Sequence, residues 1–367
     1  AHGILRHPVY LGLRGDKNAV DVVREDGRRF STATSVRLGS SGRTKSNSAE
    51  PEVSVVDQLR FLEDNRRNGT LTLPDGDTIA VTNLHKIFWP KLKLTKGDLF
   101  RYYAQVAPYL LPVVADGRMV MRRLRDGITG KTTFYQHRAT DAPEGVRVEP
   151  VKVASARPQI IGGDLKTLLY MTQLASISQD PWFSRVQSPE SAHHAALDLD
   201  PMPGVPFARV VDVARWIHDE LEKLGATGCP KTSGADGLHV YVPLPPNTPY
   251  EAGQIFCQII ATVVANKHPK HATVERMVQA RGQRVYIDFL QNIQGKTLAT
   301  AYSARASEFA GVSTPLTWKE VDEGVEREDF TMKTMPARLA KVGDLWAALR
   351  KAKGVDLTRV ARYANSI

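Results

Sequence analysis

Cysteine is scarce in this chain of 367 residues, which contains two, Cys229 and Cys257. Their positions match neither the ligand spacing of a zinc site nor the framework of a disulfide-stabilised domain. A protein that does without disulfides is typical of a reducing compartment. We therefore expect an intracellular, cytoplasmic protein.

Long apolar runs are also missing from the sequence. No stretch stays apolar over the roughly 18 residues that a membrane-spanning helix needs. No signal peptide opens the chain. These absences predict a soluble protein without a membrane partner.

Acidic residues are fewer than basic ones. The chain has 39 Asp and Glu against 49 Lys and Arg, which gives a net charge of +10. Such an excess attracts polyanions, because binding releases their counterions. The charge balance favours nucleic acid as a partner, and the alternative is a merely basic soluble protein.

The composition changes along the chain and indicates three parts. Residues 1–17 are too short for a domain and begin with Ala, so we expect a piece of a longer chain. Residues 18–70 are rich in Ser, Thr, Gly, Arg and Lys and offer little to bury, which predicts a flexible linker. Within it, residues 55–63 have the spacing of a short helix that could dock onto the domain that follows. Residues 71–367 are predicted to form one folded domain.

Two helices of this domain have clear start and stop signals. Thr95 and Asp98 predict a capping box, followed by apolar residues at helical spacing as far as Pro112, where we expect the helix to end. A second helical pattern covers residues 207–224, and Gly225 predicts its end.

The stretch Leu197-Asp198-Leu199-Asp200-Pro201 carries the main chemical signal. Side chains alternate along a strand, so Leu197 and Leu199 face a core while Asp198 and Asp200 face the other side together. Two adjacent carboxylates repel each other unless a cation lies between them, and hard divalent cations take such oxygen ligands. The pair predicts a metal site; the alternative is a polar strand edge that faces water.

Two later strands carry polar groups opposite their apolar residues, namely His239 and Asp288. As neighbours of the first strand they would bring three carboxylates together. Such a cluster can hold two divalent ions, the arrangement that serves in-line phosphoryl transfer. Taken alone, Asp288 is more often an edge-strand acid and His239 more often a core histidine whose hydrogen bonds are satisfied.

Phosphate contacts are available from nearby residues. The loop around Ser233 and Gly234 can turn backbone N–H groups toward phosphate oxygens. His239 can donate to a phosphate, and Lys296 and Arg305 can cover the rest of a triphosphate.

Three motifs carry a resemblance to a known family. LDLDPMPGV, KTSGADGLHVYVPL and QRVYIDFLQNIQGKT resemble, in that order, the three motifs of the archaeo-eukaryotic primase superfamily. The chain is most similar to the polymerase domain of bacterial DNA ligase D, from about Val81 to the C-terminus. Residues 2–17 resemble the end of the C-terminal barrel of an ATP-dependent DNA ligase, so the resemblance makes residues 1–17 a remnant of that barrel.

The resemblance implies a fold and an activity. The fold is an α/β (α+β) primase-polymerase fold, with an antiparallel-rich sheet that carries the acids and helices packed outside. The implied activity is nucleotidyl transfer from an NTP or dNTP to a primer 3′-hydroxyl with two Mn²⁺ or Mg²⁺ ions. Its biology is gap filling and end extension in bacterial non-homologous end joining, in the cytosol or nucleoid. The implied partners are DNA ends and gaps with a 5′-phosphate, the end-binding protein Ku, and the ligase and phosphoesterase domains of the parent chain.

The motif positions also imply roles for single residues. Asp198, Asp200 and Asp288 match the metal ligands. Lys86 matches a residue that recognises the 5′-phosphate, and Phe134 matches an aromatic near the templating base. The positions that match the nucleotide contacts are Ser233, Gly234, His239, Gln291, Lys296, Arg305 and Arg122.

The sequence departs from the family pattern at three places near these contacts. Gln179-Asp180 stand where relatives tend to have a histidine, Asp236 stands where a lysine can occur, and His137 replaces a lysine that often follows the aromatic pair. These departures concern the nucleotide contacts rather than the metal ligands.

Other classes of protein use part of the same set. A two-metal nuclease or phosphatase needs the acids without the triphosphate contacts, so substitution of Arg305 would spare its activity. A non-catalytic module that bridges DNA ends needs the basic surface without a third acid, so Asp288→Ala would leave it intact. A primase that starts strands de novo is a close variant of the polymerase.

Overall fold

The computed structural model describes residues 53–364 except 131–133, 137–140 and 151–157. The described residues belong to one compact unit, Glu52–Ile367. The ligase-like segment 1–17 and residues 18–52 of the expected linker lie outside the described residues. Among the helices that are described, none is both long and apolar enough to cross a membrane.

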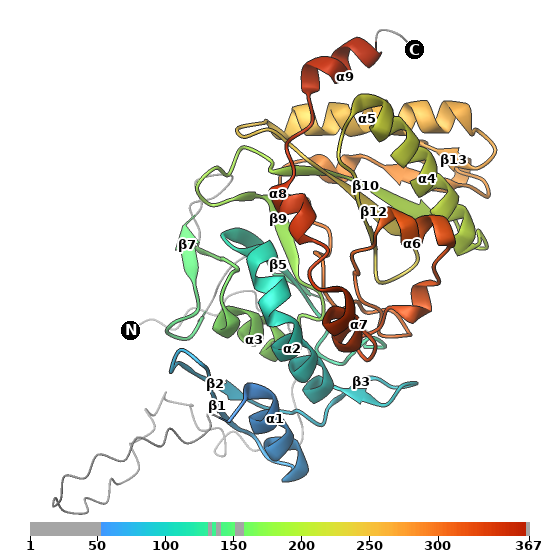
Figure 1. Cartoon of the computed structure of the whole chain (residues 1–367). Helices are drawn as coiled ribbons and strands as arrows, with labels where there is room; N and C mark the ends of the chain where they lie inside the picture. Colours follow the sequence, from blue (N-terminus) through green and yellow to red (C-terminus); the bar gives the residue numbers. More distant parts are fainter. Residues whose placement is uncertain (1–52, 131–133, 137–140, 151–157, 365–367) are drawn as a thin grey trace, which may run out of the picture. The chain divides into compact units, whose positions relative to one another are not determined.

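The elements alternate between helices and short strands along the chain (Figure 1). The helices are α1 (Val55–Asp64), α2 (Lys96–Val114), α3 (Leu165–Gln173), α4 (Phe207–Leu224), α5 (Tyr250–Lys267), α6 (Trp318–Glu323), α7 (Met335–Val342), α8 (Ala347–Lys351) and α9 (Leu357–Ala364). The strands are β1 (Gly69–Thr72), β2 (Thr78–Val81), β3 (Ile87–Trp89), β4 (Leu94–Thr95), β5 (Gly117–Arg123), β6 (Phe134–Gln136), β7 (Val148–Pro150), β8 (Pro158–Ile160), β9 (Asp180–Arg185), β10 (His194–Pro201), β11 (Cys229–Thr232), β12 (Leu238–Pro243), β13 (Ala272–Thr273) and β14 (Val285–Asp288).

The largest sheet has the strand order β11-β12-β10-β14-β13. All its pairs are antiparallel except β13 with β14. Leu197 and Leu199 of β10 and Val240 of β12 are fully buried, on the face that α4 and α5 cover (Figure 1). The opposite face is left for the polar residues of the same strands, because side chains alternate. The predicted antiparallel-rich sheet with helices packed outside is therefore confirmed.

A second sheet, of order β6-β5-β9, supplies the other wall of the site. Asp180 at the start of β9 pairs with Val120 of β5 in antiparallel register. Opposite residues of such a pair share a face of the sheet. Val120, Asp180 and Arg122 line the same cavity as Asp198, so the site lies between the two sheets.

Helix α2 begins as its sequence predicts and ends later. Thr95 accepts from the Asp98 N–H and Asp98 caps the Thr95 N–H in return, which confirms the capping box. The helix continues through Pro112 to Val114, so the expected end at Pro112 is wrong. A proline in the last turn removes one hydrogen bond near an end that already lacks partners for its carbonyl groups. At the other helix, Gly225 caps α4 in the left-handed conformation, as expected.

The folded unit begins before residue 71, where the sequence indicated its start. Residues 55–64 form α1, and Leu59 of this helix is fully buried. Glu63 of α1 forms an ion pair with Arg101 of α2. Leu71 lies inside the β1–β2 hairpin, opposite Ile79. The short helix that the sequence predicts over residues 55–63 is therefore confirmed, and it docks onto α2 as part of the folded unit instead of belonging to a flexible linker.

Candidate active site

The three acids come together at one end of the central sheet. Asp198 of β10 pairs directly with Asp288 of β14, and Asp200 lies two residues further along β10. Ligand oxygens of all three carboxylates lie within 4.8 Å of one another. Strand alternation on β10 and its pairing with β14 are enough to produce this cluster.

The carboxylates are in an environment that penalises their charge. Burial, and then the neighbouring carboxylates, raise the pKa of Asp198 and of Asp200 to about 7. The positive charge of Arg305 opposes this rise at both residues. A divalent cation would relieve the repulsion, and the donor set consists of the hard oxygen ligands that Mg²⁺ and Mn²⁺ prefer. The residues present therefore fit a metal site.

Asp288 is oriented by neighbouring residues of the third motif. Its Oδ1 accepts from the Leu290 N–H at 2.8 Å and from the Tyr286 hydroxyl at 3.3 Å. Its Oδ2 accepts from Nε2 of Gln291 at 2.9 Å. Gln291, predicted as a nucleotide contact, also lines the cavity described below, so it touches both the metal-ligand acid and the cavity.

Asp198 is held by a buried chain of polar side chains. His239 lies opposite it on β12, with Nε2 at 3.1 Å from Oδ1 of Asp198. The other ring nitrogen, Nδ1, lies 2.6 Å from Nζ of Lys231, a fully buried residue. His239 was predicted to contact phosphate, and in this structure its ring contacts Asp198 and Lys231.

The loop after β11 is shaped by Ser233 and Gly234. Oγ of Ser233 accepts from the N–H groups of Ala235 and Gly237, at 3.1 and 3.0 Å. Gly234 has φ +78°, and a Cβ there would lie 2.5 Å from Cγ of Arg305. Glycine therefore permits both the turn and the close approach of Arg305, whose Nη1 donates to the Ser233 carbonyl at 2.7 Å.

A cavity of about 520 Å³ opens beside the acids. Its lining includes Asp198, Asp200 and most of the residues predicted to contact the nucleotide. The predicted site residues that line it are Arg122, Asp198, Asp200, Ser233, His239, Gln291, Lys296 and Arg305. Gly234 does not line the cavity. It affects the cavity indirectly, because it shapes the loop that carries Ser233 and lets Arg305 come close.

A second cavity of about 720 Å³ adjoins the first. Arg122 and Arg305 line both cavities. At the second cavity, Arg327 forms ion pairs with Asp236 and Glu328, and its guanidinium lies 5.7 Å from the ring centroid of Phe309. The shared arginines make the two cavities neighbours in one basic groove.

The two predicted DNA contacts are Lys86 and Phe134. Nζ of Lys86 pairs with Asp126 at 2.7 Å, and Lys86 is not in the lining of either cavity. Phe134 lies in β6 opposite Arg123, and its side chain is outside what the structure describes.

Three residues at the site had no role in the sequence analysis. Lys231 holds His239, and Asp180 lines the cavity wall opposite the acids. The guanidinium of Arg281 lies 3.6 Å from the ring centroid of Tyr286, and its charge opposes the rise in the pKa of Asp200. Lys231 lies in the quoted second motif, yet only its complete burial reveals its function.

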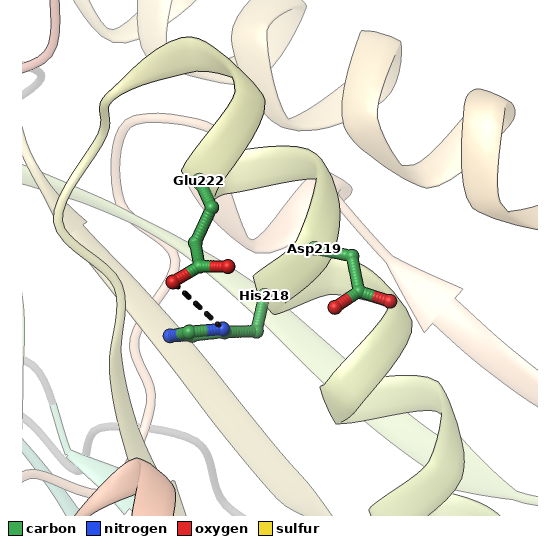
Figure 2. A group of neighbouring side chains, drawn as sticks. All are labelled: His218, Asp219 and Glu222. Carbon is green, nitrogen blue, oxygen red and sulfur yellow. Dashed lines mark ion pairs between the residues drawn. The ribbon is translucent and has the colours of Figure 1, made fainter.

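A second group of possible metal ligands lies on α4, namely His218, Asp219 and Glu222 (Figure 2). Helical spacing brings them together, with Nδ1 of His218 at 4.0 Å from Oε1 of Glu222. Asp219 and Glu222 are exposed, and the His218 ring lies 3.9 Å from the ring of Trp318. The triad on the central sheet is the better candidate, because it combines partial burial with a cavity.

Comparison with known proteins agrees with the fold and the motifs. The family model of the LigD primase-polymerase domain matches residues 95–346. The bifunctional non-homologous end joining protein LigD of Bacillus subtilis is 32% identical over 271 residues, which cover 74% of this chain and 44% of the relative. The multifunctional LigD of Pseudomonas aeruginosa is 25% identical over 348 residues, 94% of this chain and 38% of that protein.

A solved structure shows the same architecture. The polymerase domain of Mycobacterium tuberculosis ligase D in complex with DNA superimposes with a TM-score of 0.68 at 28% identity. The match covers 75% of this chain and 99% of that domain. The fold is thus that of a primase-polymerase domain. The chain belongs to the LigD primase-polymerase domain family, and it spans less than half the length of the curated relatives it matches.

Proposed function

We propose that this chain is a DNA-directed nucleotidyltransferase that adds NTPs or dNTPs to a primer 3′-hydroxyl. The observation that carries the proposal is the pairing of Asp198 with Asp288 beside a cavity that Arg122, Lys296 and Arg305 also line. Acids and cations around one cavity suit a nucleoside triphosphate that carries bound divalent ions.

Asp198, Asp200 and Asp288 would hold the metal, proposed as two Mn²⁺ or Mg²⁺ ions. When bound, such ions lower the pKa of an attacking hydroxyl and offset charge on the leaving pyrophosphate. The chain's own residues keep the ligands in place: Lys231 and His239 fix Asp198, and Gln291 fixes Asp288.

The remaining contacts are assigned to the nucleotide and to DNA. Arg122, Lys296 and Arg305 are placed to bind phosphate oxygens in the cavity that Ser233 also lines. The loop N–H groups of Ala235 and Gly237 already donate to Oγ of Ser233, so they are not assigned to phosphate. We assign recognition of the 5′-phosphate across a gap to Lys86 and stacking near the templating base to Phe134. The solved relative in complex with DNA supports DNA as the partner.

The biological setting follows from the relatives, which are non-homologous end joining proteins. We propose gap filling and end extension at DNA breaks in the bacterial cytosol or nucleoid, with Ku as a partner. Residues 1–17 are proposed as the end of a ligase domain, joined through residues 18–52 to the polymerase domain of the same parent chain. A phosphoesterase domain is proposed to complete that chain.

Extension of a labelled primer opposite a 5′-phosphorylated gap, with NTP and Mn²⁺, tests the proposal. The wild type is compared with Asp198→Ala/Asp200→Ala at matched DNA occupancy. Asp219→Ala, on the exposed group of α4, is the control that removes an acid away from the cavity. We expect extension by the wild type and by the control, and none by the double variant.

Each alternative gives a different result in the same assay. Tight DNA binding without extension by the wild type would identify an end-bridging module. Loss of primer nucleotides in the presence of metal, unaffected by Arg305→Ala, would identify a two-metal nuclease. Extension that survives in the double variant would show that the acids are not the catalytic site.

A further inference from the structure

Asp180 places a carboxylate in the wall of the proposed nucleotide cavity. It pairs with Val120 of β5, and Arg122 follows Val120 by two residues, so the three side chains face the same way. All three line the cavity of about 520 Å³ that also holds Asp198 and Arg305. Asp180 is not one of the three clustered acids, which stand on the other sheet.

The surroundings of this carboxylate are largely cationic. Its Oδ2 accepts from Oγ of Ser178 at 2.6 Å. Burial raises the pKa of Asp180, while the charges of Arg305, Arg122 and Lys231 oppose the rise. Lys231 already donates to His239, Ala299 and Ser313. Arg122 and Arg305 line the cavity, so they are the cations whose positive charge acts both on Asp180 and on an anionic ligand that enters the cavity.

These arginines have donors left for such a ligand. Nε of Arg122 has no hydrogen-bond partner among the described residues although it is buried. Nη1 of Arg305 donates to the Ser233 carbonyl, which fixes the side chain beside the loop without neutralising its charge. An anion that enters the cavity meets both guanidinium groups together with the negative charge of Asp180.

We propose that Asp180 is a specificity-determining residue, the resident counter-anion of Arg122 and Arg305, and that it weakens the hold of the cavity on polyphosphates. The effect is largest for pyrophosphate, since this product is held by its charge alone and lacks the contacts of a base and a sugar. The inference rests on the proposed function, which makes pyrophosphate the leaving group. Asp180 thereby speeds release of the product at the expense of phosphate affinity.

Direct binding of pyrophosphate tests the inference without any requirement for polymerisation. Isothermal titration calorimetry with sodium pyrophosphate, with and without MgCl₂, is carried out on the wild type, Asp180→Asn and Asp322→Asn. Asp322 is an exposed acid of α6 outside both cavities, so its substitution makes the same change in net charge. We expect Asp180→Asn to bind pyrophosphate about tenfold more tightly, and Asp322→Asn to stay within about twofold of the wild type.

The direction in which pyrophosphate affinity changes distinguishes this role from a merely structural one. If Asp180 only orients the arginines, its loss would weaken pyrophosphate binding, and a weaker or unchanged affinity overturns the inference. A thermal melt verifies that Asp180→Asn is folded. If it is not, the titration is carried out with Asp180→Ser, which also removes the carboxylate.

Primer extension shows which of the two proposals has failed. Tighter pyrophosphate binding by Asp180→Asn, with no extension by the wild type, removes the proposed function and with it the role in product release, and leaves only the weakened hold of the cavity on polyphosphates. Extension by the wild type with unchanged pyrophosphate affinity in Asp180→Asn removes the inference alone.

Discussion

Asp198 and His239 face each other across strands β10 and β12, with Oδ1 and Nε2 3.1 Å apart. Lys231 donates to Nδ1 of His239, to the Ala299 carbonyl and to Oγ of Ser313. Burial keeps the pKa of His239 low, so the ring is neutral, and with Lys231 as the donor to Nδ1 the ring proton lies on Nε2. That proton points at Asp198, and the lysine thus sets both the tautomer of the histidine and the orientation of the carboxylate.

Replacement of Lys231 by methionine tests this arrangement. Lys231→Met leaves His239 Nδ1, the Ala299 carbonyl and the Ser313 hydroxyl buried with a partner missing. We expect the free energy of unfolding in urea to fall by about 3 kcal/mol. Lys223→Met removes a half-exposed lysine from α4 and is expected to cost less than about 1 kcal/mol. Equal losses of unfolding free energy in the two variants would contradict the buried contacts of Lys231 with His239, Ala299 and Ser313.

The triad should destabilise the protein when no metal is bound. Asp288→Asn removes one of three repelling charges, so we expect it to raise the metal-free free energy of unfolding by about 1 kcal/mol. MnCl₂ is expected to raise the melting temperature of the wild type and to have little effect on the variant. Differential scanning calorimetry with and without EDTA measures both changes. A metal-induced rise of equal size in the two proteins would place the metal elsewhere.

The same repulsion predicts a pH dependence. The pKa of Asp198 and of Asp200 is raised to about 7 in the folded protein, from an ordinary value of 3.8. Between these values the folded state binds more protons than the unfolded state, so metal-free stability decreases as pH rises from about 4 to about 7. Urea unfolding at several pH values compares the wild type with Asp200→Asn. The variant is expected to lose less stability over this range, and parallel curves would argue against the raised pKa values.

The position of α1 in the folded unit is also open to measurement. Leu59 of this helix is fully buried, whereas Phe61 on the same helix is 55% exposed. We expect Leu59→Ala to lower the free energy of unfolding by about 3 kcal/mol and Phe61→Ala to lower it by less than about 1 kcal/mol. Small effects of both substitutions on the free energy of unfolding would show that α1 belongs to the linker and not to the folded unit.

The cluster of Asp198, Asp200 and Asp288 could be predicted from the sequence because it depends on local periodicity. The alternation of Leu and Asp in β10 sets the direction of Asp198 and Asp200, and antiparallel pairing with β14 brings Asp288 beside them. The ends of α2 and α4 follow equally local rules, with the exception of Pro112.

Other features depend on the tertiary structure. Nothing in the sequence near Lys231 signals that it would be fully buried against Ser313, 82 residues away. Asp180 faces the cavity because β9 pairs with β5, and single-strand patterns do not specify that pairing. The burial of Leu59 likewise requires contacts that a polar local composition conceals.

Arg122 and Arg305 border both cavities of the groove. Negative charge that is held in one cavity lowers the positive potential available in the other, unless the two ligands share the guanidinium groups by hydrogen bonds. Either way, occupancy of one cavity changes the affinity of the other, and this coupling must be equal in both directions. Under the proposed function, a DNA strand that occupied the larger cavity would therefore help to decide how tightly a nucleotide is held in the smaller one.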